Sequence, residues 1–370
     1  MAVQTDADAP TVDGHTPEER DPRVPWRPSQ AGYVARGIVW AIIIAFVIAI
    51  PHLVPDTQIN IVSRAALYGI VALSMNVLLG YAGQVSLGHQ AFFGIGAFGS
   101  GYIITEVGMG WIAGIIGATI IGGLFSLLLG AIALRVRGFY FAIVTIAFGL
   151  FTQEVIFNIR RLTGGGAGMP AERPEFFSGD IVYAYVCIAA LVVVWLFDWR
   201  LTATKAGRAI EALRDDERVA ASWGINVKGF MLLAFAISGA MAGLAGGLFA
   251  SIEQVVSPVT FNFTLGLLFM LMTVVGGLRS RPGVVTGGIV FAALPFLLEA
   301  AHGLSWWPGF IGPLWEPLIG AVLLLLTLIF FPGGIAQQNE DLYRWLSFQP
   351  FHSDKKDSVG GVVDTSGQRP

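Results

Sequence analysis

Continuous apolar runs of about 20 residues recur along most of this chain, each long enough to cross a bilayer as a helix. A transmembrane barrel would instead show short segments of alternating apolar and polar residues. The pattern therefore predicts an all-α polytopic membrane protein with about ten transmembrane helices. These segments cover residues 37–54, 59–79, 90–106, 111–134, 139–158, 181–198, 229–251, 261–278, 284–301 and 314–331.

Polar segments flank this apolar region, which we take as a membrane domain over residues 37–335. Residues 1–36 are rich in Asp, Pro, Thr and Arg and predict a disordered tail. That tail is too long and too acidic for the charged start of a signal peptide, so we expect the first apolar run to stay as an anchor. Residues 336–370 predict a second polar tail.

Positive charge is distributed unevenly between the two sides of this predicted topology. Only Arg64, Arg160, Arg161 and Arg173 fall on one side, and the rest of the 22 Lys and Arg residues fall on the other. Cytoplasmic loops carry the excess of Lys and Arg. We therefore expect both termini and the charged loop 199–228 to be cytoplasmic.

Within that loop, residues 205–228 (KAGRAIEALRDDERVAASWGINVK) are dense in charge between two long apolar runs. Ile210, Leu213 and Ala220 recur at roughly helical spacing, and Gly224 is a stop signal. The pattern predicts a short helix outside the membrane, with a small and aliphatic face available to a partner. The alternative is a solvated connector whose amphipathic pattern is incidental.

Glycine is densest over residues 79–101 (LGYAGQVSLGHQAFFGIGAFGSG), where it interrupts what would otherwise be one helix. A broken helix at membrane depth is tolerated where it is buried in protein or lines a watery cavity, and such breaks indicate transport pathways. The alternative is a cytoplasmic turn in which His89 caps the next helix. The candidate pathway residues are Gly80, Gly83, Gln84, Ser86, His89 and Gln90.

Two further glycine patterns indicate close helix packing. Gly239, Gly243 and Gly247 are spaced by four and predict a smooth helix face. Residues 94–99 match the dinucleotide fingerprint GxGxxG, but they lack the preceding strand and the surrounding βαβ unit. We therefore reject a nucleotide site there.

Composition and motifs argue against most other chemistry. The chain is 55% hydrophobic and 13% charged, and its net charge of −3 gives no basis for nucleic-acid binding. It has no P-loop, no His/Glu metal pair and no nucleophile elbow, so we expect no catalytic residue and no metal. The one cysteine, Cys187, lies in an apolar run and supports neither a disulfide nor zinc. An enzyme is the weakest hypothesis.

Several stretches, in order, resemble one family. They are residues 73–98 (LSMNVLLGYAGQVSLGHQAFFGIGAF), 137–149 (RGFYFAIVTIAFG), 163–169 (TGGGAGM), 207–227 (GRAIEALRDDERVAASWGINV), 238–250 (SGAMAGLAGGLFA) and 274–288 (VVGGLRSRPGVVTGG). Together they look like the permease of high-affinity branched-chain amino acid ABC importers, in particular its LivM-like member. The resemblance covers roughly residues 37–335.

This resemblance implies one subunit of a multi-part importer in the bacterial cytoplasmic membrane. Its partners would be a related LivH-like permease, two cytoplasmic ABC ATPases that hydrolyse ATP, an extracytoplasmic substrate-binding protein and membrane lipid, with no cofactor held by this chain. The resemblance also implies two bundles of opposite orientation. The implied ATPase-coupling residues are Arg208, Glu211, Ala212, Asp215, Asp216, Ala220, Ala221 and Gly224.

The match departs from the family pattern after the VxGG element, where residues 276–283 read GGLRSRPG. Arg279 and Arg281 add charge there, which puts the usual packing against the ATPase in doubt. Other functions also stay open. A urea or short-chain amide importer has a similar permease, while a secondary transporter would work without an ATPase and a scaffold would not need the polar break.

Overall fold

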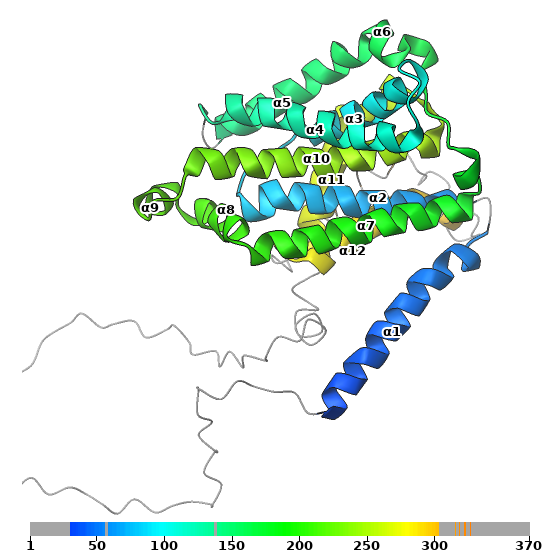
Figure 1. Ribbon diagram of the computed structural model, residues 1–370, viewed down its shortest axis with the longest axis horizontal. Coiled ribbons are helices and arrows are strands. Elements are labelled where there is room, and N and C mark those ends of the chain that lie inside the picture. Colours follow the sequence, from blue (N-terminus) through cyan, green and yellow to red (C-terminus); the bar gives the residue numbers. More distant parts are fainter. Residues whose placement is uncertain are drawn as a thin grey trace, which may run out of the picture. The chain divides into compact units, whose positions relative to one another are not determined.

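The structure is a computed structural model that describes residues 30–55, 58–136, 139–302 and the single positions 315, 318, 322 and 326 (Figure 1). Contacts divide the chain into two units. The first, Met1–Ile44 with Arg344–Pro370, is described only over residues 30–44, within helix α1. The second, Ala45–Tyr343, holds all the features discussed below.

Helices make up nearly all of the described residues. The long ones are α1 (Gln30–Leu53), which begins in the first unit, and, in the second unit, α2 (Ile59–Met75), α3 (His89–Thr105), α4 (Trp111–Ala133), α5 (Phe139–Glu154), α7 (Asp180–Ala203), α10 (Val227–Glu253), α11 (Phe263–Gly276) and α12 (Arg281–His302). The short ones are η2 (Asn76–Tyr81), η3 (Ile156–Asn158), α6 (Arg160–Thr163), η4 (Gly165–Ala167), η5 (Glu175–Phe177), α8 (Lys205–Asp215), α9 (Glu217–Ser222) and η6 (Pro258–Phe261). The strands are β1 (Met169–Pro170) and β2 (Val255–Val256), paired antiparallel.

The first nine expected apolar segments each coincide with a helix. Helix α1 begins at Gln30, inside the segment expected to be a polar tail. The segment expected over 314–331 and both outer tails lie outside the described residues, apart from the single positions named above.

Within the described residues, five helices are long and apolar enough to cross a membrane. They are Ile59–Tyr81, Trp111–Ile132, Tyr140–Asn158, Asp180–Ala203 and Val227–Glu253, with shorter apolar helices at Phe263–Gly276 and Arg281–Leu297. The chain is therefore a helical, multi-pass membrane protein.

Helices α2 and α10 run side by side through the middle of the bundle (Figure 1). Helices α3 and α4 pack on α10, while α7 and α12 pack on α2 and α11 packs on α12. Buried polar side chains join the two central helices, because the hydroxyls of Ser74 and Ser238 each donate to the other residue's carbonyl oxygen, at 2.7 and 2.8 Å.

Glycine residues on α10, which have no side chain, allow this dense packing. A Cβ on Gly243 would lie 2.4 Å from the carbonyl oxygen of Ala118 in α4, and one on Gly239 would lie 2.1 Å from the Ser126 Cβ. Gly247 faces the same helix, with the Ala118 Cβ 2.7 Å away. The three glycines expected to form a smooth face thus lie against α4. Backbones that approach this closely gain van der Waals contact, which is the main source of helix association in lipid.

We expect Gly243→Ala to lower the midpoint of thermal unfolding in detergent. Its new methyl group would meet backbone atoms, and overpacking of this kind costs about 1–3 kcal/mol. The matched control is Gly99→Ala, because there the nearest atom is the flexible end of Ile121, at 3.3 Å. Equal midpoints for the two variants would contradict the close contact between α10 and α4.

Candidate functional site

The chain breaks its helical course between α2 and α3, over residues 76–88, which we call the helix break. Helix α2 continues as the π-helix η2, and the Ala82 amide bonds to the Val77 carbonyl five residues back. Gly83 then takes a positive φ of 68°, a conformation that glycine adopts at little cost. A π-helical turn often marks a functional position, because it frees backbone groups from the regular ladder.

Most of the predicted pathway residues lie in the protein interior, Gly80 among them. Ser86, His89 and Gln90 are buried, Gln84 is half-buried and Gly83 is exposed. His89 does not cap α3, since the N-cap is Gly88 and no side chain bonds there. Its Nε2 instead lies 2.7 Å from the Ser74 hydroxyl, which joins the break to the paired serines of α2 and α10.

Gln90 occupies a confined position among three helices. A Cβ on Gly149 of α5 would lie 2.6 Å from its Nε2, and a Cβ on Gly266 of α11 would lie 2.2 Å from its Oε1. Among the described residues, neither atom of this buried amide has a hydrogen-bond partner. Leaving a buried polar group unpaired costs roughly 1–3 kcal/mol, so Gln90 is the least satisfied polar side chain among the predicted pathway residues.

The charged loop forms two helices instead of one. Thr204 caps α8, and its hydroxyl accepts a bond from the Gly207 amide at 3.3 Å. Asp216 ends α8 in extended conformation and caps α9, since its Oδ1 accepts from the amides of Arg218 and Val219. Capping by short polar side chains is the usual start of a helix. Asp216 therefore holds the corner between α8 and α9.

The aliphatic face that we expected to be open to a partner is buried within this chain. Ile210, Leu213 and Ala220 are each less than 5% exposed. They pack in the main hydrophobic core, since an amphipathic helix beside an apolar bundle buries its own apolar stripe first. The prediction identified the correct apolar face, but this face packs against the bundle of the same chain and not against a partner.

The exposed face of α8 and α9 consists of other residues. Trp223 is 82% exposed and Val219 is 54% exposed. Neither was singled out from the sequence, although a Trp inside a charged segment was a usable signal. Of the expected coupling residues, Arg208, Asp215, Asp216, Ala221 and Gly224 are exposed, while Glu211 and Ala212 are half-buried.

Arg214 connects α8 directly to the helix break. Its Nη1 donates to the Gly80 carbonyl oxygen at 2.5 Å, and its side-chain carbons lie beside Gly83. A carbonyl freed by the π-helical turn is therefore paired by a residue from the charged loop. A movement of α8 would act on the break through this contact.

A second connection reaches the break from α7 and α12. The Tyr81 hydroxyl donates to the Asp198 Oδ2 at 2.9 Å, and the Arg281 Nε donates to the same oxygen at 2.7 Å. Arg281 also bonds the Thr202 hydroxyl. Asp198 is fully buried, so its pairing with Arg281 compensates for the removal of its charge from water.

The loop between α11 and α12 completes the contacts around the break. The Arg279 amide donates to the Asn76 Oδ1 at 2.8 Å, and Arg279 adopts a positive φ of 69°. Both of the arginines that distinguish residues 276–283 from the family pattern therefore take part in the hydrogen bonds that hold the helix break. Arg279 contributes its backbone there, and Arg281 contributes its charge.

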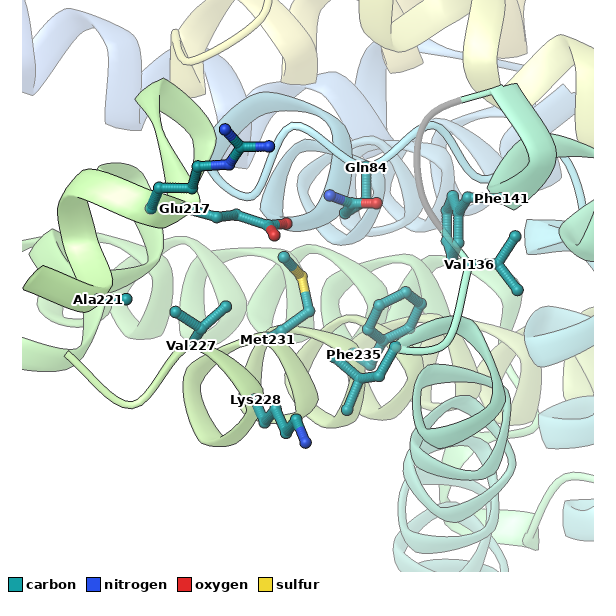
Figure 2. Close-up of a pocket in the computed structure, with 11 residues that line it drawn as sticks. Gln84, Val136, Phe141, Glu217, Ala221, Val227, Lys228, Met231 and Phe235 are labelled. Atoms are coloured by element: carbon teal, nitrogen blue, oxygen red, sulfur yellow. The ribbon is translucent and has the colours of Figure 1, made fainter.

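A pocket of about 220 Å³ lies between the helix break, the junction of α4 and α5, and the start of α10 (Figure 2). We call it the α9–α10 pocket. Its lining residues are Gln84, Leu134, Val136, Phe141, Glu217, Arg218, Ala221, Val227, Lys228, Met231 and Phe235. Among the described residues, no group of three His, Cys, Asp or Glu side chains could hold a metal ion.

We expect Arg281→Ala to destabilise the protein, because it leaves the Asp198 carboxylate buried without its cation. Breaking a buried ion pair from one side costs about 3–5 kcal/mol, whereas replacing both partners by apolar groups of similar volume is often neutral. The midpoint of thermal unfolding in detergent should therefore fall for Arg281→Ala. It should largely recover when Arg281→Met and Asp198→Leu are combined with Tyr81→Phe, which removes the hydroxyl that donates to Asp198. A combined variant as unstable as Arg281→Ala would contradict this role.

Comparison with known proteins places these features in a family. Residues 57–330 match the family described as the branched-chain amino acid transport system permease component. LivM, the high-affinity branched-chain amino acid transport system permease protein of Escherichia coli K12, is 31% identical over 321 residues, which cover 79% of this chain and 73% of that protein. LivH of the same organism is 26% identical over 307 residues, which cover 76% of this chain and 94% of that protein.

Among solved structures, a chain of PsaBC from Streptococcus pneumoniae in complex with Fab gives a TM-score of 0.41 at 14% identity, over 81% of this chain and 99% of that chain. That likeness is too slight to bear on function. The match over 57–330 and the identity to LivM are sufficient by themselves. The chain, a transport protein and not an enzyme, belongs to the LivM-like permeases of branched-chain amino acid transport systems.

Proposed function

We propose that this chain is the LivM-like permease subunit of an ATP-binding-cassette importer, and that it moves branched-chain, aliphatic amino acids into the cytoplasm by alternating access. Its partners would be a LivH-like second permease, two cytoplasmic ATPases and an extracytoplasmic binding protein. The ATPases would hydrolyse ATP, with no cofactor bound by this chain. The observation that carries the proposal is the bond from the Arg214 Nη1 in the charged loop to the Gly80 carbonyl in the helix break.

The proposed setting is the bacterial cytoplasmic membrane, with about ten spans, two inverted repeats and both termini in the cytoplasm. In the predicted topology, the side that holds the charged loop carries most of the Lys and Arg residues, as cytoplasmic loops do. The ATPases would bind the exposed face of these two helices. Trp223 would be the main anchor, because buried Trp residues often dominate interfaces.

The coupling would reach the break by two routes, one from α8 and one from α7 and α12. Arg214 pairs the Gly80 carbonyl, and Tyr81 bonds Asp198, which Arg281 holds from α12. ATPases that close on nucleotide would displace α8. This displacement would favour a second arrangement of the permease, in which these contacts differ from those of the present structure. A ligand or partner shifts an equilibrium only through such differential contacts.

The pathway would pass the buried side chains that follow the break. Ser86 and Gln90 keep polar atoms without a hydrogen-bond partner among the described residues. An amino acid presents an ammonium and a carboxylate, which need polar groups on their way, while its aliphatic part needs only an apolar wall. We therefore infer that the Gln90 amide forms a hydrogen bond with the substrate in one state of the transport cycle.

We expect Trp223→Ala to reduce recovery of the ATPases by about tenfold or more when the tagged protein is extracted gently from its native membrane, the size expected for a hot-spot Trp. Trp223 is 82% exposed, so the bundle itself should stay folded. The matched control is Phe176→Ala, since Phe176 is 81% exposed on the opposite loop. Wild-type protein that recovers no ATPase, and is active in liposomes without ATP, would overturn the importer assignment.

The same preparation also tests the substrate. Recovery of a LivH-like permease, with a binding protein encoded nearby, would allow that binding protein to be screened against leucine, isoleucine, valine, urea and short amides. Preference for the branched-chain amino acids supports the proposal. Preference for urea or amides would reassign the substrate while leaving the architecture intact.

We expect Gln90→Leu to keep or raise thermal stability and yet to lower amino acid uptake by at least about tenfold. Replacing an unpaired buried amide by an apolar group of similar size removes a desolvation cost from the fold. The control is Ser100→Ala on the same helix, whose buried hydroxyl likewise lacks a partner among the described residues. Full uptake by Gln90→Leu would make Gln90 a packing residue.

A further inference from the structure

Helix α5 carries Thr145, Gly149 and Gln153 in one row, which we call the α5 ridge. Their spacing of four residues places them on one face of the helix, and the row spans about 12 Å at about 1.5 Å per residue. Thr145 and Gly149 are buried and Gln153 is half-buried, whereas Ile143 and Leu150 on the opposite face are exposed. The α5 ridge is therefore the side by which this helix contacts the rest of the chain.

One end of the α5 ridge holds the helix break. The Thr145 hydroxyl donates to the Ala142 carbonyl oxygen at 2.8 Å and accepts from the Leu87 amide at 3.1 Å. The break lies directly on α5 here, because a Cβ on Gly88 would lie 2.2 Å from the Thr145 carbonyl oxygen. Leu87 and Gly88 immediately precede α3, so Thr145 fixes the start of that helix.

The other end of the α5 ridge holds the start of α11. The Gln153 Oε1 accepts from the amide of Phe263, the first residue of α11, at 2.9 Å. The Gln153 Nε2 donates to the Glu154 Oε1 at 2.9 Å, which helps to keep the Oε1 turned toward α11. The first amides of a helix have no partner within the helix, and the N-cap Asn262 accepts from Leu265. Gln153 therefore pairs an amide that the N-cap does not.

The segments held at the two ends of the α5 ridge come from opposite ends of the central helix pair. Arg64, near the start of α2, pairs with Glu253, the last residue of α10, so the two helices run antiparallel. The break follows the end of α2, and residues 254–262 follow the end of α10. The α5 ridge thus contacts the segment that leaves each end of this pair.

The middle of the α5 ridge covers the Gln90 amide. Gly149 lies against this amide from α5, and Gly266 lies against it from α11. A side chain larger than that of glycine at either position would meet the amide. Gln90 is therefore enclosed as long as α3, α5 and α11 keep their present separation, which the bonds of Thr145 and Gln153 set.

Helix α5 is otherwise packed lightly within the described residues. In its apolar span, Tyr140–Asn158, 28% of the membrane-spanning stretch is buried, against 78% in the span Ile59–Tyr81 that contains α2. Because few apolar contacts hold α5, its hydrogen bonds to Leu87 and Phe263 contribute a larger share of its positioning. The backbone between the two bonds is a continuous helix, which carries a displacement of one end to the other.

We propose that Thr145 and Gln153 are positioning residues for transport. Together they fix the start of α3 and the start of α11 against α5 and so keep the Gln90 amide covered. When either end is displaced, α5 transmits the displacement to the other end, and the amide becomes accessible to the substrate. The effect on transport rests on the role that the proposed function gives to Gln90, whereas the linkage between the two bonds is a property of this chain alone.

Hydrogen exchange on the purified full chain in nanodiscs tests the linkage. Gln153→Leu removes the acceptor for the Phe263 amide. We expect exchange about fivefold faster at residues 263–265 and also at residues 87–90, the size expected for losing one hydrogen bond. Thr145→Val should have the same two effects, since coupling between two sites is reciprocal. A purely local role would change only the segment that loses its bond.

Two matched variants serve as controls. Thr152→Val removes a buried hydroxyl of the same helix that donates to the Phe148 carbonyl oxygen of α5 itself, so exchange at both ends should equal that of the wild type. Gln153→Glu combined with Glu154→Gln keeps an oxygen for the Phe263 amide and an amide beside a carboxylate, so it should restore the exchange of the wild type. A cooperative thermal unfolding transition shows that each variant is folded.

Two results would overturn the linkage. One is exchange at residues 87–90 that is the same in Gln153→Leu as in the wild type. The other is an effect of Thr152→Val as large as that of Gln153→Leu, which would show that any change within α5 loosens the site.

The effect on transport is measured in liposomes that contain the assembled importer. Leucine uptake should fall several-fold in both Gln153→Leu and Thr145→Val, and it should be kept by Thr152→Val and by the combined variant. Full uptake by Gln153→Leu and Thr145→Val would refute the positioning role. Absence of ATP-driven uptake by the wild type would instead refute the proposed function, while hydrogen exchange on the isolated chain would still decide whether α5 links its two ends.

Discussion

Backbone polar groups that leave a helix inside an apolar bundle must find partners within the protein, and this requirement organises the site. The π-helical turn η2, whose residues are buried, and the non-helical residues after it release such groups. The Gly80 carbonyl finds its partner in a distant segment, since it accepts from the Arg214 guanidinium. The break in turn supplies the Asn76 Oδ1, which accepts from the backbone amide of Arg279 in the α11–α12 turn. An unpaired polar group in an apolar interior costs several kcal/mol. The helix break, the charged loop and the α11–α12 turn therefore depend on one another for hydrogen-bond partners.

The same requirement makes the break suitable for transmitting movement. A regular helix satisfies its own hydrogen bonds and responds little to a neighbour. The break is held by side chains from α8, α7 and α12, so a shift of any of these changes its contacts. The rigid part of the molecule lies beside it, where α10 packs against α4 and α3 at backbone distance. A break held by neighbouring helices beside a tightly packed core is the arrangement that the proposed coupling would require.

The charged loop shows how tertiary packing reassigns an amphipathic face. Ile210, Leu213 and Ala220 form the stripe that the sequence pattern reveals, and the bundle itself covers them. What remains for a partner is the polar face with Val219 and Trp223, whose exposure no periodicity argument would provide. The capping role of Asp216 also divides the loop into two helices. A charge reversal there would disturb α9 itself, so Trp223 is the cleaner probe of coupling.

The sequence by itself determined the helical membrane class, the first nine helices, the broken segment after α2 and the family. These follow from local properties, namely apolar runs of spanning length, glycine at positions that interrupt or smooth a helix, and motifs in a fixed order. Only the tertiary structure decided that Arg214 bonds Gly80, that Asp198 joins Tyr81 to Arg281, that Gln90 lies between Gly149 and Gly266, and that Glu217 and Met231 share a pocket. Each of these joins residues far apart in the chain, and a one-dimensional pattern contains the periodicity of a helix but not the identity of its neighbours.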